Sequence, residues 1–412
     1  MRRPPAPGCC SAALVLCPGR CARGAGLALA LLALLLLLLP VQRRLGLELS
    51  RTPARPQGPR APVTAASEPV TRPPHLTPIP SLPPSLGDTY GRDETYRSSE
   101  CPSSIRKRIA ATEFGATFLA TIPVLQWAQH AREDEYRRLR RYAGAHGWKD
   151  ISWDVLKASL SLLNTSASGL LFDGRQPAVP ARCVRCAVVG NGGILNGSRM
   201  GPTIDAHDHV FRVNGAITVG FERDVGNRTS FYVFSTNTMM NSLSSYAADG
   251  FKHPPQTPET RYVFLPDHDR DYLLLRAALT HQRVDRGRDK GAWPQEYFGP
   301  DLRPGKFRML HPDFIRYLRN RFLRADILAT PHWPLYRPST GAVMLLAAIH
   351  TCDEVSAFGF MTPGYRAYSD HYFDRRHKQV QFFANHDLKM EMQLWQRLQR
   401  SGLLRLYTGT EG

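Results

Sequence analysis

The hydrophobic and polar positions of this chain change character twice along its length. An apolar stretch occupies residues 24–41 and is dominated by leucine between Leu27 and Leu39. A proline-rich segment follows, up to about residue 100, and beyond it aliphatic, aromatic and charged residues are mixed as in globular proteins. The pattern predicts a membrane-related segment, a linker and one folded domain within the 412 residues.

The apolar stretch matches the thickness of a bilayer. As a helix it would span about 27 Å, close to the ~30 Å hydrocarbon core. A cleaved signal peptide is the alternative, but its apolar core usually has about 7–15 residues and ends at a small-residue cleavage site. Here the stretch ends in Pro40 and Val41 and runs into Arg43 and Arg44. The pattern favours an uncleaved signal anchor over 24–41, with residues 1–23 as a cytoplasmic tail.

The linker is a predicted stem over residues 42–100. Prolines recur every few residues between Pro53 and Pro84, interleaved with Thr, Ser and Arg. Such a composition cannot bury enough apolar surface to fold, so we expect a disordered segment that holds the folded domain away from the membrane.

Residues 101–412 alternate between strand-like and helix-like patterns. Short apolar runs predict strands at Cys186–Val189, His209–Val213, Ser230–Phe234, Tyr262–Leu265 and Val355–Phe360. Longer periodic segments predict helices at Tyr136–Tyr142, Trp153–Leu163, Gly341–His350 and Leu388–Leu398. The alternation predicts an α/β fold in which helices flank a mostly parallel sheet within a single domain.

The charge balance points to an anionic ligand. The formal net charge is +18, yet no run of five or more basic residues occurs. Zinc-finger spacings, aromatic RNA-binding signatures and basic heptad helices are also missing from the sequence. We therefore expect no nucleic-acid partner, and the excess of Arg and Lys suits an acidic lipid or a sugar nucleotide better.

Cysteines and glycosylation sequons indicate the orientation. The folded region contains Cys101, Cys183, Cys186 and Cys352, an even set that would form two disulfides in an oxidising lumen, in one of three pairings. The same region carries Asn-X-Ser/Thr sequons at Asn164, Asn196 and Asn227. Both features favour a luminal domain and a cytosolic N-terminus. The four cysteines before the anchor (Cys9, Cys10, Cys17 and Cys21) are either plain small residues or palmitoylation sites.

The strongest local motif is CAVVGNGG, from Cys186 to Gly193. A buried strand that runs into a glycine cluster would place exposed backbone amides at the carboxyl edge of a parallel sheet, where α/β folds bind nucleotides. The alternative is a tight turn that needs positive φ. Neither the P-loop pattern nor the dinucleotide-binding pattern is complete here.

Four segments in order resemble the sialylmotifs of eukaryotic sialyltransferases. CAVVGNGGILNGS with FRVNG and DVGNRTSF resembles the long motif, and PSTG continuing to CDEVSAFGF resembles the short motif. HYFD, from His371 to Asp374, is similar to the third motif, and His386 with Glu391 to the very short one. The motifs span residues 186–391. The segments LHPDF and SDHYF resemble those of the N-acetylgalactosaminide α-2,6-sialyltransferases in particular.

The resemblance implies a Rossmann-like variant of the GT-A fold and transfer of sialic acid from CMP-sialic acid with inversion. His386 would be the base that takes the proton of the acceptor hydroxyl, since an imidazole with a pKa of about 6–7 suits that task. His371 would lie against the donor phosphate and stabilise the departing charge. The alternative is that both histidines only cap or pack.

The resemblance also implies donor contacts and disulfide pairs. Asn191 and Asn214 would hydrogen-bond the CMP, and Ser339, Thr340 and Gly341 would offer hydroxyls and a helix N-terminus to phosphate or ribose. The alternative for PSTG is an ordinary helix cap. Glu391 lies about 140° around a helix from His386, which predicts a structural role. Cys186 would pair with Cys352, which leaves Cys101 and Cys183 to pair.

Two acidic and histidine-rich segments resemble metal sites. The first contains the D-x-D spacing that other glycosyltransferases use for a divalent ion, in Asp267, His268, Asp269 and Asp271. The second contains side chains that resemble metal ligands, in His207, Asp208 and His209. Neighbouring strand residues point to opposite faces, and aspartates after a strand commonly cap turns. The resembled family works without an essential metal, so we expect no metal and no cofactor besides the donor.

We therefore expect a Golgi membrane enzyme, single-pass and type II, that links sialic acid α-2,6 to GalNAc on Ser or Thr of glycoproteins. The alternatives are a sialyltransferase acting on galactose or a glycolipid, and a nucleotide-sugar-binding Golgi protein without catalysis. The acceptor would be chosen by loops around Ser242–Pro255 and Gln282–Pro304. The sequence leaves open whether the chain forms a homodimer.

Overall fold

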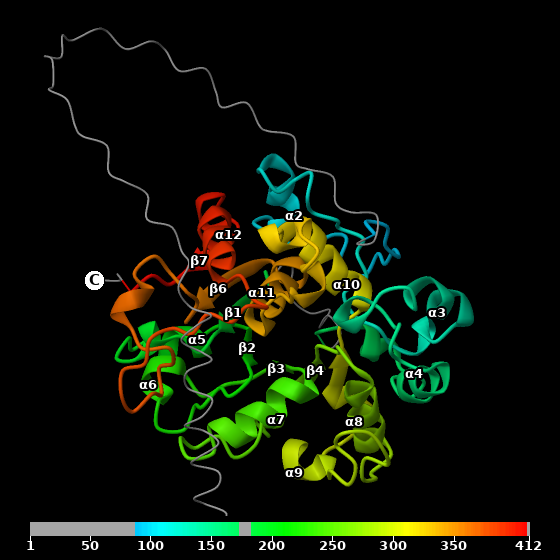
Figure 1. Cartoon of the computed structure of the whole chain (residues 1–412). Helices are drawn as coiled ribbons and strands as arrows, with labels where there is room; N and C mark the ends of the chain where they lie inside the picture. Colours follow the sequence, from blue (N-terminus) through cyan, green and yellow to red (C-terminus); the bar gives the residue numbers. More distant parts are fainter. Residues whose placement is uncertain (1–86, 173–182, 410–412) are drawn as a thin grey trace, which may run out of the picture. The chain divides into compact units, whose positions relative to one another are not determined.

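A seven-stranded sheet forms the centre of the computed structural model, which describes residues 87–172 and 183–409. Every pair of neighbouring strands is parallel, as the sequence predicted for most of the sheet (Figure 1). The strands are β1 (Arg185–Val189), β2 (His209–Val213), β3 (Phe231–Phe234), β4 (Arg261–Phe264), β5 (Phe307–Met309), β6 (Glu354–Phe358) and β7 (Arg405–Leu406).

Both faces of the sheet are buried because side chains alternate along each strand. Cys186 and Val188 of β1 join one hydrophobic cluster, whereas Ala187 and Val189 join the other. The first cluster includes residues of α2 (Ile105–Arg108), α10 (Pro312–Tyr317), α11 (Thr340–Thr351) and α12 (Leu388–Arg400). The second includes residues of α3 (Glu133–Leu139), α4 (Trp153–Leu160), α5 (Gly201–Asp205), α6 (Glu222–Val225), α7 (Thr236–Ser245), α8 (Asp269–Leu279) and α9 (Pro294–Phe298). The sequences of the strands are therefore mostly apolar rather than alternating between apolar and polar residues.

The strand order fixes where a ligand would bind. The sheet runs β5-β4-β3-β2-β1-β6-β7, so the chain leaves β1 in one direction and returns to the other side of β1 with β6. In open α/β sheets the crevice at such a reversal, beyond the carboxyl ends of the strands, is the usual binding place. The glycine cluster that follows β1 lies at this point.

Part of the predicted stem belongs to the folded domain. The carbonyl of Gly87 accepts hydrogen bonds from Arg316 and Asn320, and the N–H of Gly91 donates to the carboxylate of Asp313 at 2.7 Å. Tyr90 packs edge-on against a core tyrosine as well. Residues 87–100, assigned to the stem by composition, therefore belong to the α/β body, because their few aromatic and acidic side chains find partners there.

The predicted anchor (24–41) and the rest of the predicted stem (42–86) lie outside the described residues, as does the predicted tail (1–23). Within residues 87–172 and 183–409, no helix has the length and apolar character that crossing a bilayer requires.

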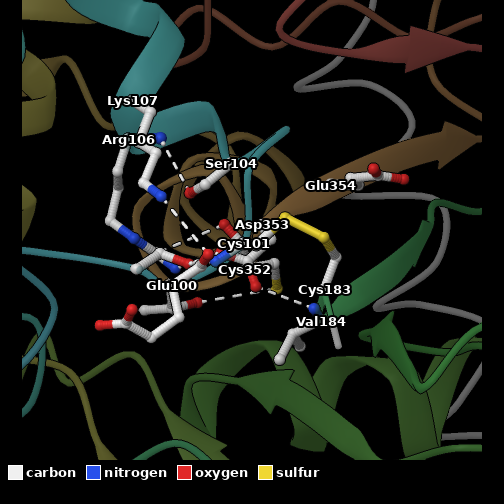
Figure 2. Close-up of polar contacts among 12 residues, drawn as sticks. Glu100, Cys101, Ser104, Arg106, Lys107, Cys183, Val184, Cys352, Asp353 and Glu354 are labelled. Atoms are coloured by element: carbon white, nitrogen blue, oxygen red, sulfur yellow. Dashed lines mark hydrogen bonds and ion pairs between the residues drawn. A yellow bond between two sulfur atoms is a disulfide. The ribbon is translucent and has the colours of Figure 1, made fainter. Parts of the chain in front are cut away.

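Two disulfides close the domain with the pairing that the resemblance implied. They join Cys101 to Cys183 and Cys186 to Cys352. The buried Asp353 directly follows Cys352 (Figure 2). One of its oxygens accepts from the guanidinium of Arg106 and the other from the N–H of Val184, at 2.7 and 2.8 Å. The N-terminal segment, the entry to β1 and the loop before β6 are thus tied together.

Candidate functional site

A cavity of about 560 Å³ opens at the reversal point of the sheet. Its walls come from the ends of β1, β2 and β6, the N-terminus of α11 and the segment 361–386. The volume lies in the range of small-molecule sites, which hold drug-sized ligands. All seven predicted catalytic and donor-binding residues line it: Asn191, Asn214, Ser339, Thr340, Gly341, His371 and His386.

The glycine cluster is required for close packing of backbones. A Cβ on Gly190 or Gly192 would stand 2.7 or 2.6 Å from the carbonyl oxygen of Gly359, and one on Gly193 would strike the backbone of Ser369. None of these three glycines has positive φ, so the alternative of a positive-φ turn is wrong.

The same packing uses up the amides that the sequence predicted to be exposed. The N–H groups of Gly190, Gly192 and Gly193 donate to the carbonyls of Phe358, Gly359 and Ser369 at 2.8–3.2 Å. They are therefore not free to bind a phosphate. This expectation was wrong because the reversal of strand order brings the loop after β6 directly against the loop after β1.

Two asparagines present unsatisfied oxygens to the cavity. Asn191 follows β1 and donates its amide N–H to the carbonyl of Val213 at 3.3 Å, and Asn214 follows β2 with φ 51°. The side-chain oxygen of each is buried and accepts no hydrogen bond within the described residues. A buried acceptor without a partner costs about 1–3 kcal/mol, so both oxygens are poised for a donor group on a ligand.

Replacing Asn214 with glycine is expected to weaken CMP binding about tenfold. Glycine keeps the positive φ without strain and removes only the amide, so the loss reports one ligand hydrogen bond. Titration calorimetry with CMP measures it. His281→Gly, at an exposed residue with φ 53° that does not line the cavity, is the matched control. An unchanged dissociation constant for Asn214→Gly would show that this oxygen does not contact the nucleotide.

The N-terminus of α11 points at the cavity, but its first hydroxyl is already occupied. Ser339 is the N-cap: its Oγ accepts from the N–H of Ala342 at 3.0 Å and donates to Glu391 at 2.7 Å. Its backbone N–H also donates to Glu391. The helix-cap alternative therefore applies to Ser339, whereas Thr340 and Gly341 line the cavity at the first turn of this twelve-residue helix.

Glu391 joins two motifs that are far apart in the sequence. Its buried carboxylate holds Ser339 at the start of α11, although Glu391 itself belongs to α12. Burial raises the pKa of this carboxyl to about 7. The structural role predicted from its helical spacing agrees with these contacts.

The shifted pKa predicts a pH dependence of stability. A carboxyl whose pKa is higher in the folded than in the unfolded state stabilises most below its unfolded value of 4.5, and this contribution is lost as the pH rises through about 7. From pH 5 to pH 8, wild type should lose on the order of 2 kcal/mol more than Glu391→Gln. Chemical denaturation at both pH values measures this difference, with Glu133→Gln on exposed α3 as control. Parallel pH profiles of wild type and Glu391→Gln would contradict it.

His386 has one ring nitrogen bound and one available. Nδ1 lies 2.7 Å from the carbonyl oxygen of Arg337, and the backbone N–H donates to the carbonyl of Phe383. Because a carbonyl only accepts, Nδ1 carries the proton and Nε2 keeps a lone pair. Burial lowers the pKa of His386 below its usual 6.5. The neutral ring, which can accept a proton, is therefore favoured at neutral pH.

His371 lies against the glycine cluster and lines the same cavity. Its backbone forms a bridge with Gly192, and its ring stacks on Phe373 with centroids 5.0 Å apart. Nε2 lies 3.4 Å from the hydroxyl of Tyr246, while Nδ1 faces the carboxylate of Asp374 at 3.8 Å. The ring is thus fixed between aromatic and acidic neighbours beside the glycine cluster.

The acidic side chains of the first segment that resembled a metal site contact other protein groups. Asp271 accepts from the N–H groups of Asp267 and His268, and Asp267 contacts Arg337. The exposed Asp269 belongs to the same segment. Nowhere in the described ranges do three or more His, Cys, Asp or Glu side chains gather to hold a metal ion.

The side chains of the second such segment, residues 207–209, also have separate protein partners. His207 hydrogen-bonds Ser356 and backbone carbonyls, the carboxylate of Asp208 accepts from Arg185, and His209 stacks on Phe172. The three sequon asparagines, Asn164, Asn196 and Asn227, are all exposed, although Nδ2 of Asn196 donates to the carbonyl of Tyr372 at 2.7 Å.

Three residues of the site were not predicted from the sequence. Tyr246 lines the cavity, Asp374 accepts from the backbone N–H of His371 at 2.8 Å, and Arg337 holds His386. Tyr246 does fall within the segment Ser242–Pro255 that was expected to choose the acceptor. The HYFD motif contains Asp374, and Arg337 directly precedes PSTG, so position next to a motif was the available signal.

The chain is similar in sequence to known sialyltransferases. The family model of glycosyltransferase family 29 (sialyltransferase) matches residues 125–403. The chain is 50% identical over 315 residues to the mouse alpha-N-acetylgalactosaminide alpha-2,6-sialyltransferase 2 and 52% identical over 294 residues to the human protein of that name. These alignments cover 76% and 71% of this chain, and 84% and 78% of the relatives.

Solved structures agree with the sequence matches. A crystal structure of a mammalian sialyltransferase aligns with a TM-score of 0.55 at 26% identity, and its complex with Gal-beta-1-3GalNAc-ortho-nitrophenol with 0.54 at 25%. Each covers 76% of this chain and the whole of the other. Together with the family model and the close relatives, they show that this chain belongs to glycosyltransferase family 29, the sialyltransferases.

Proposed function

We propose that this enzyme transfers sialic acid from CMP-sialic acid to the 6-hydroxyl of GalNAc linked to Ser or Thr of glycoproteins, with inversion. The observation that carries the chemistry is the bare Nε2 of His386 in the same cavity as the unsatisfied oxygens of Asn191 and Asn214. The acceptor follows from the relatives, which are named alpha-N-acetylgalactosaminide alpha-2,6-sialyltransferases.

The donor would lie across the carboxyl edge of the sheet. The oxygens of Asn191 and Asn214 would accept hydrogen bonds from the nucleotide at the ends of β1 and β2. The first turn of α11, at Thr340 and Gly341, would supply N–H groups and a positive helix end to the phosphate. Because three amides of the glycine cluster are occupied, this helix end is the better phosphate site.

His386 would take the proton of the acceptor hydroxyl as its oxygen attacks the anomeric carbon of sialic acid. The new C–O bond forms while the bond from that carbon to the phosphate oxygen breaks, and the electron pair leaves with CMP. Burial lowers the pKa of His386, which favours the unprotonated ring that a base needs.

His371 would donate a hydrogen bond to the leaving phosphate. Its backbone forms a bridge with Gly192 of the glycine cluster, and the hydroxyl of Tyr246 lies beside Nε2. A donor fixed where negative charge develops stabilises the transition state without reorganisation. Protein groups would thus neutralise the phosphate, and we propose that no metal or further cofactor takes part.

The proposal extends to the cellular setting. Residues 24–41 would anchor the chain in the Golgi membrane with a short cytoplasmic tail, and 42–86 would form the stem. The disulfides and the exposed sequon asparagines support a luminal domain. O-glycosylated glycoproteins would be the acceptors that this domain meets.

The test uses the full-length protein in detergent with CMP-sialic acid. The acceptors are glycopeptides carrying Ser- or Thr-linked GalNAc, the same peptides with Gal-β-1,3-GalNAc, and a free galactoside. Mass spectrometry and linkage analysis are expected to find sialic acid on the 6-position of GalNAc. Transfer to galactose instead would overturn the acceptor assignment. CMP binding without transfer to any acceptor would favour a nucleotide-binding protein without catalysis.

A further inference from the structure

Asp267 is a buried aspartate that the proposed reaction does not use. It follows the carboxyl end of β4, and its side chain is 1% exposed. One carboxylate oxygen contacts the guanidinium of Arg337, and the other accepts from Nδ1 of His268 at 2.7 Å. A buried carboxylate is costly unless it is paired, so its ion pair with Arg337 has a strong reason to persist.

Arg337 connects this carboxylate to the proposed base. Its backbone N–H donates to the carbonyl of Asn385 at 2.9 Å, and its carbonyl accepts from Nδ1 of His386 at 2.7 Å. Both main-chain polar groups of Arg337 thus form hydrogen bonds with the segment that carries His386. The following Pro338 restricts Arg337 to an extended backbone, so the direction of its Cα–Cβ bond relative to its carbonyl varies little.

We propose that Asp267 is a positioning residue for His386, acting through the side chain and carbonyl of Arg337. The inference rests on the proposed function, because it takes His386 as the base. Without Asp267, the side chain of Arg337, which is 37% exposed, is free to turn toward solvent. The carbonyl that fixes the tautomer and tilt of His386 then loses its anchor. Displacing a catalytic group by about 1 Å costs up to 100-fold in rate.

The D-x-D-like segment gains a physical explanation from this arrangement. Asp271 stabilises the turn, because its carboxylate accepts from the N–H groups of Asp267, His268 and Thr236 at 2.7–3.2 Å. In this turn the carboxylate of Asp267 contacts both Arg337 and the ring of His268. In this segment Asp271 therefore stabilises a turn, and Asp267 forms an ion pair.

Replacing Asp267 with asparagine is the direct test. The amide keeps the size of the side chain and removes the charge that holds Arg337. We expect kcat to fall 10- to 100-fold and CMP affinity to stay within twofold, because neither Asp267 nor Arg337 lines the cavity and the start of α11 is held by Glu391. Asp269→Asn removes an equal charge two residues away at an exposed position and should leave kcat unchanged. An unchanged kcat in Asp267→Asn, or a parallel loss of CMP affinity, would overturn the proposal.

A double-mutant cycle separates positioning from general destabilisation. In a His386→Ala background, Asp267→Asn should produce less than a twofold further change in the residual rate. A merely structural role would lower the rate by the same factor in both backgrounds. Equal factors would therefore refute the coupling.

Nitrogen-15 NMR of histidine-labelled protein gives a readout that does not need catalysis. The His386 signals, identified by their loss in His386→Gln, should show Nδ1–H and bare Nε2 in wild type and a mixture of tautomers in Asp267→Asn. Identical His386 signals in both proteins would contradict the positioning role of Asp267, whichever acceptor the enzyme uses. If wild type transferred nothing but the tautomer shift appeared, the proposed function would fail and the coupling would stand.

Discussion

Replacing His386 with alanine is expected to lower kcat about 10²- to 10⁴-fold, the usual contribution of a general base. The reason is the single available lone pair: Nδ1 is committed to the carbonyl of Arg337, so only Nε2 can take the acceptor proton. CMP affinity should change less than twofold, because in the proposed arrangement Asn191, Asn214 and the start of α11 would hold the nucleotide. Initial rates at saturating donor and calorimetry with CMP measure the two effects.

The pH profile of the wild type offers a second check on the same residue. Because burial lowers the pKa of His386, the acid limb of kcat should lie below pH 6.5. His377→Ala, an exposed histidine that does not line the cavity, should retain wild-type activity. A loss smaller than tenfold in His386→Ala would show that another group is the base.

The strands next to the site were predictable because both of their faces are buried. Continuous apolar runs at β1, β2, β3, β4 and β6 gave bounds within two residues of those observed. The edge strands β5 and β7 were missed, since they contain three and two residues and carry no pattern that distinguishes them from loops. Helices α7 and α8 were missed as well, because α7 is mostly polar and α8 is preceded by an acidic turn that resembled a metal site.

The residues of the site were found because they lie within motifs, but their partners were not. Ser339 and Glu391 stand 52 positions apart and Arg337 and Asp267 stand 70 apart, and no local pattern indicates that either pair touches. The same limit explains the error at the glycine cluster. From the sequence, its amides looked free, because the carbonyl of Gly359 that occupies one of them follows β6, far along the chain.

Removing the Cys186–Cys352 disulfide by substituting both cysteines with alanine is expected to destabilise the domain by about 2–5 kcal/mol. The bond spans 166 positions, and closing so long a loop restricts the unfolded chain strongly. Both cysteines are fully buried, Cys186 in β1 and Cys352 at the C-terminal end of α11. Thermal unfolding followed by fluorescence should show a melting temperature lower by about 5–15 °C.

The effect on the site distinguishes this disulfide from the other one. The Cys186–Cys352 bond joins the strand that leads into Asn191 to the helix that begins at Thr340, so its loss should also weaken CMP binding. The Cys101–Cys183 bond spans 82 positions and ties the N-terminal segment to the entry of β1 instead (Figure 2). Its double alanine variant should melt at a lower temperature than wild type but keep wild-type CMP affinity. If both double variants lost CMP affinity equally, the link between β1 and α11 would not be what holds the donor site.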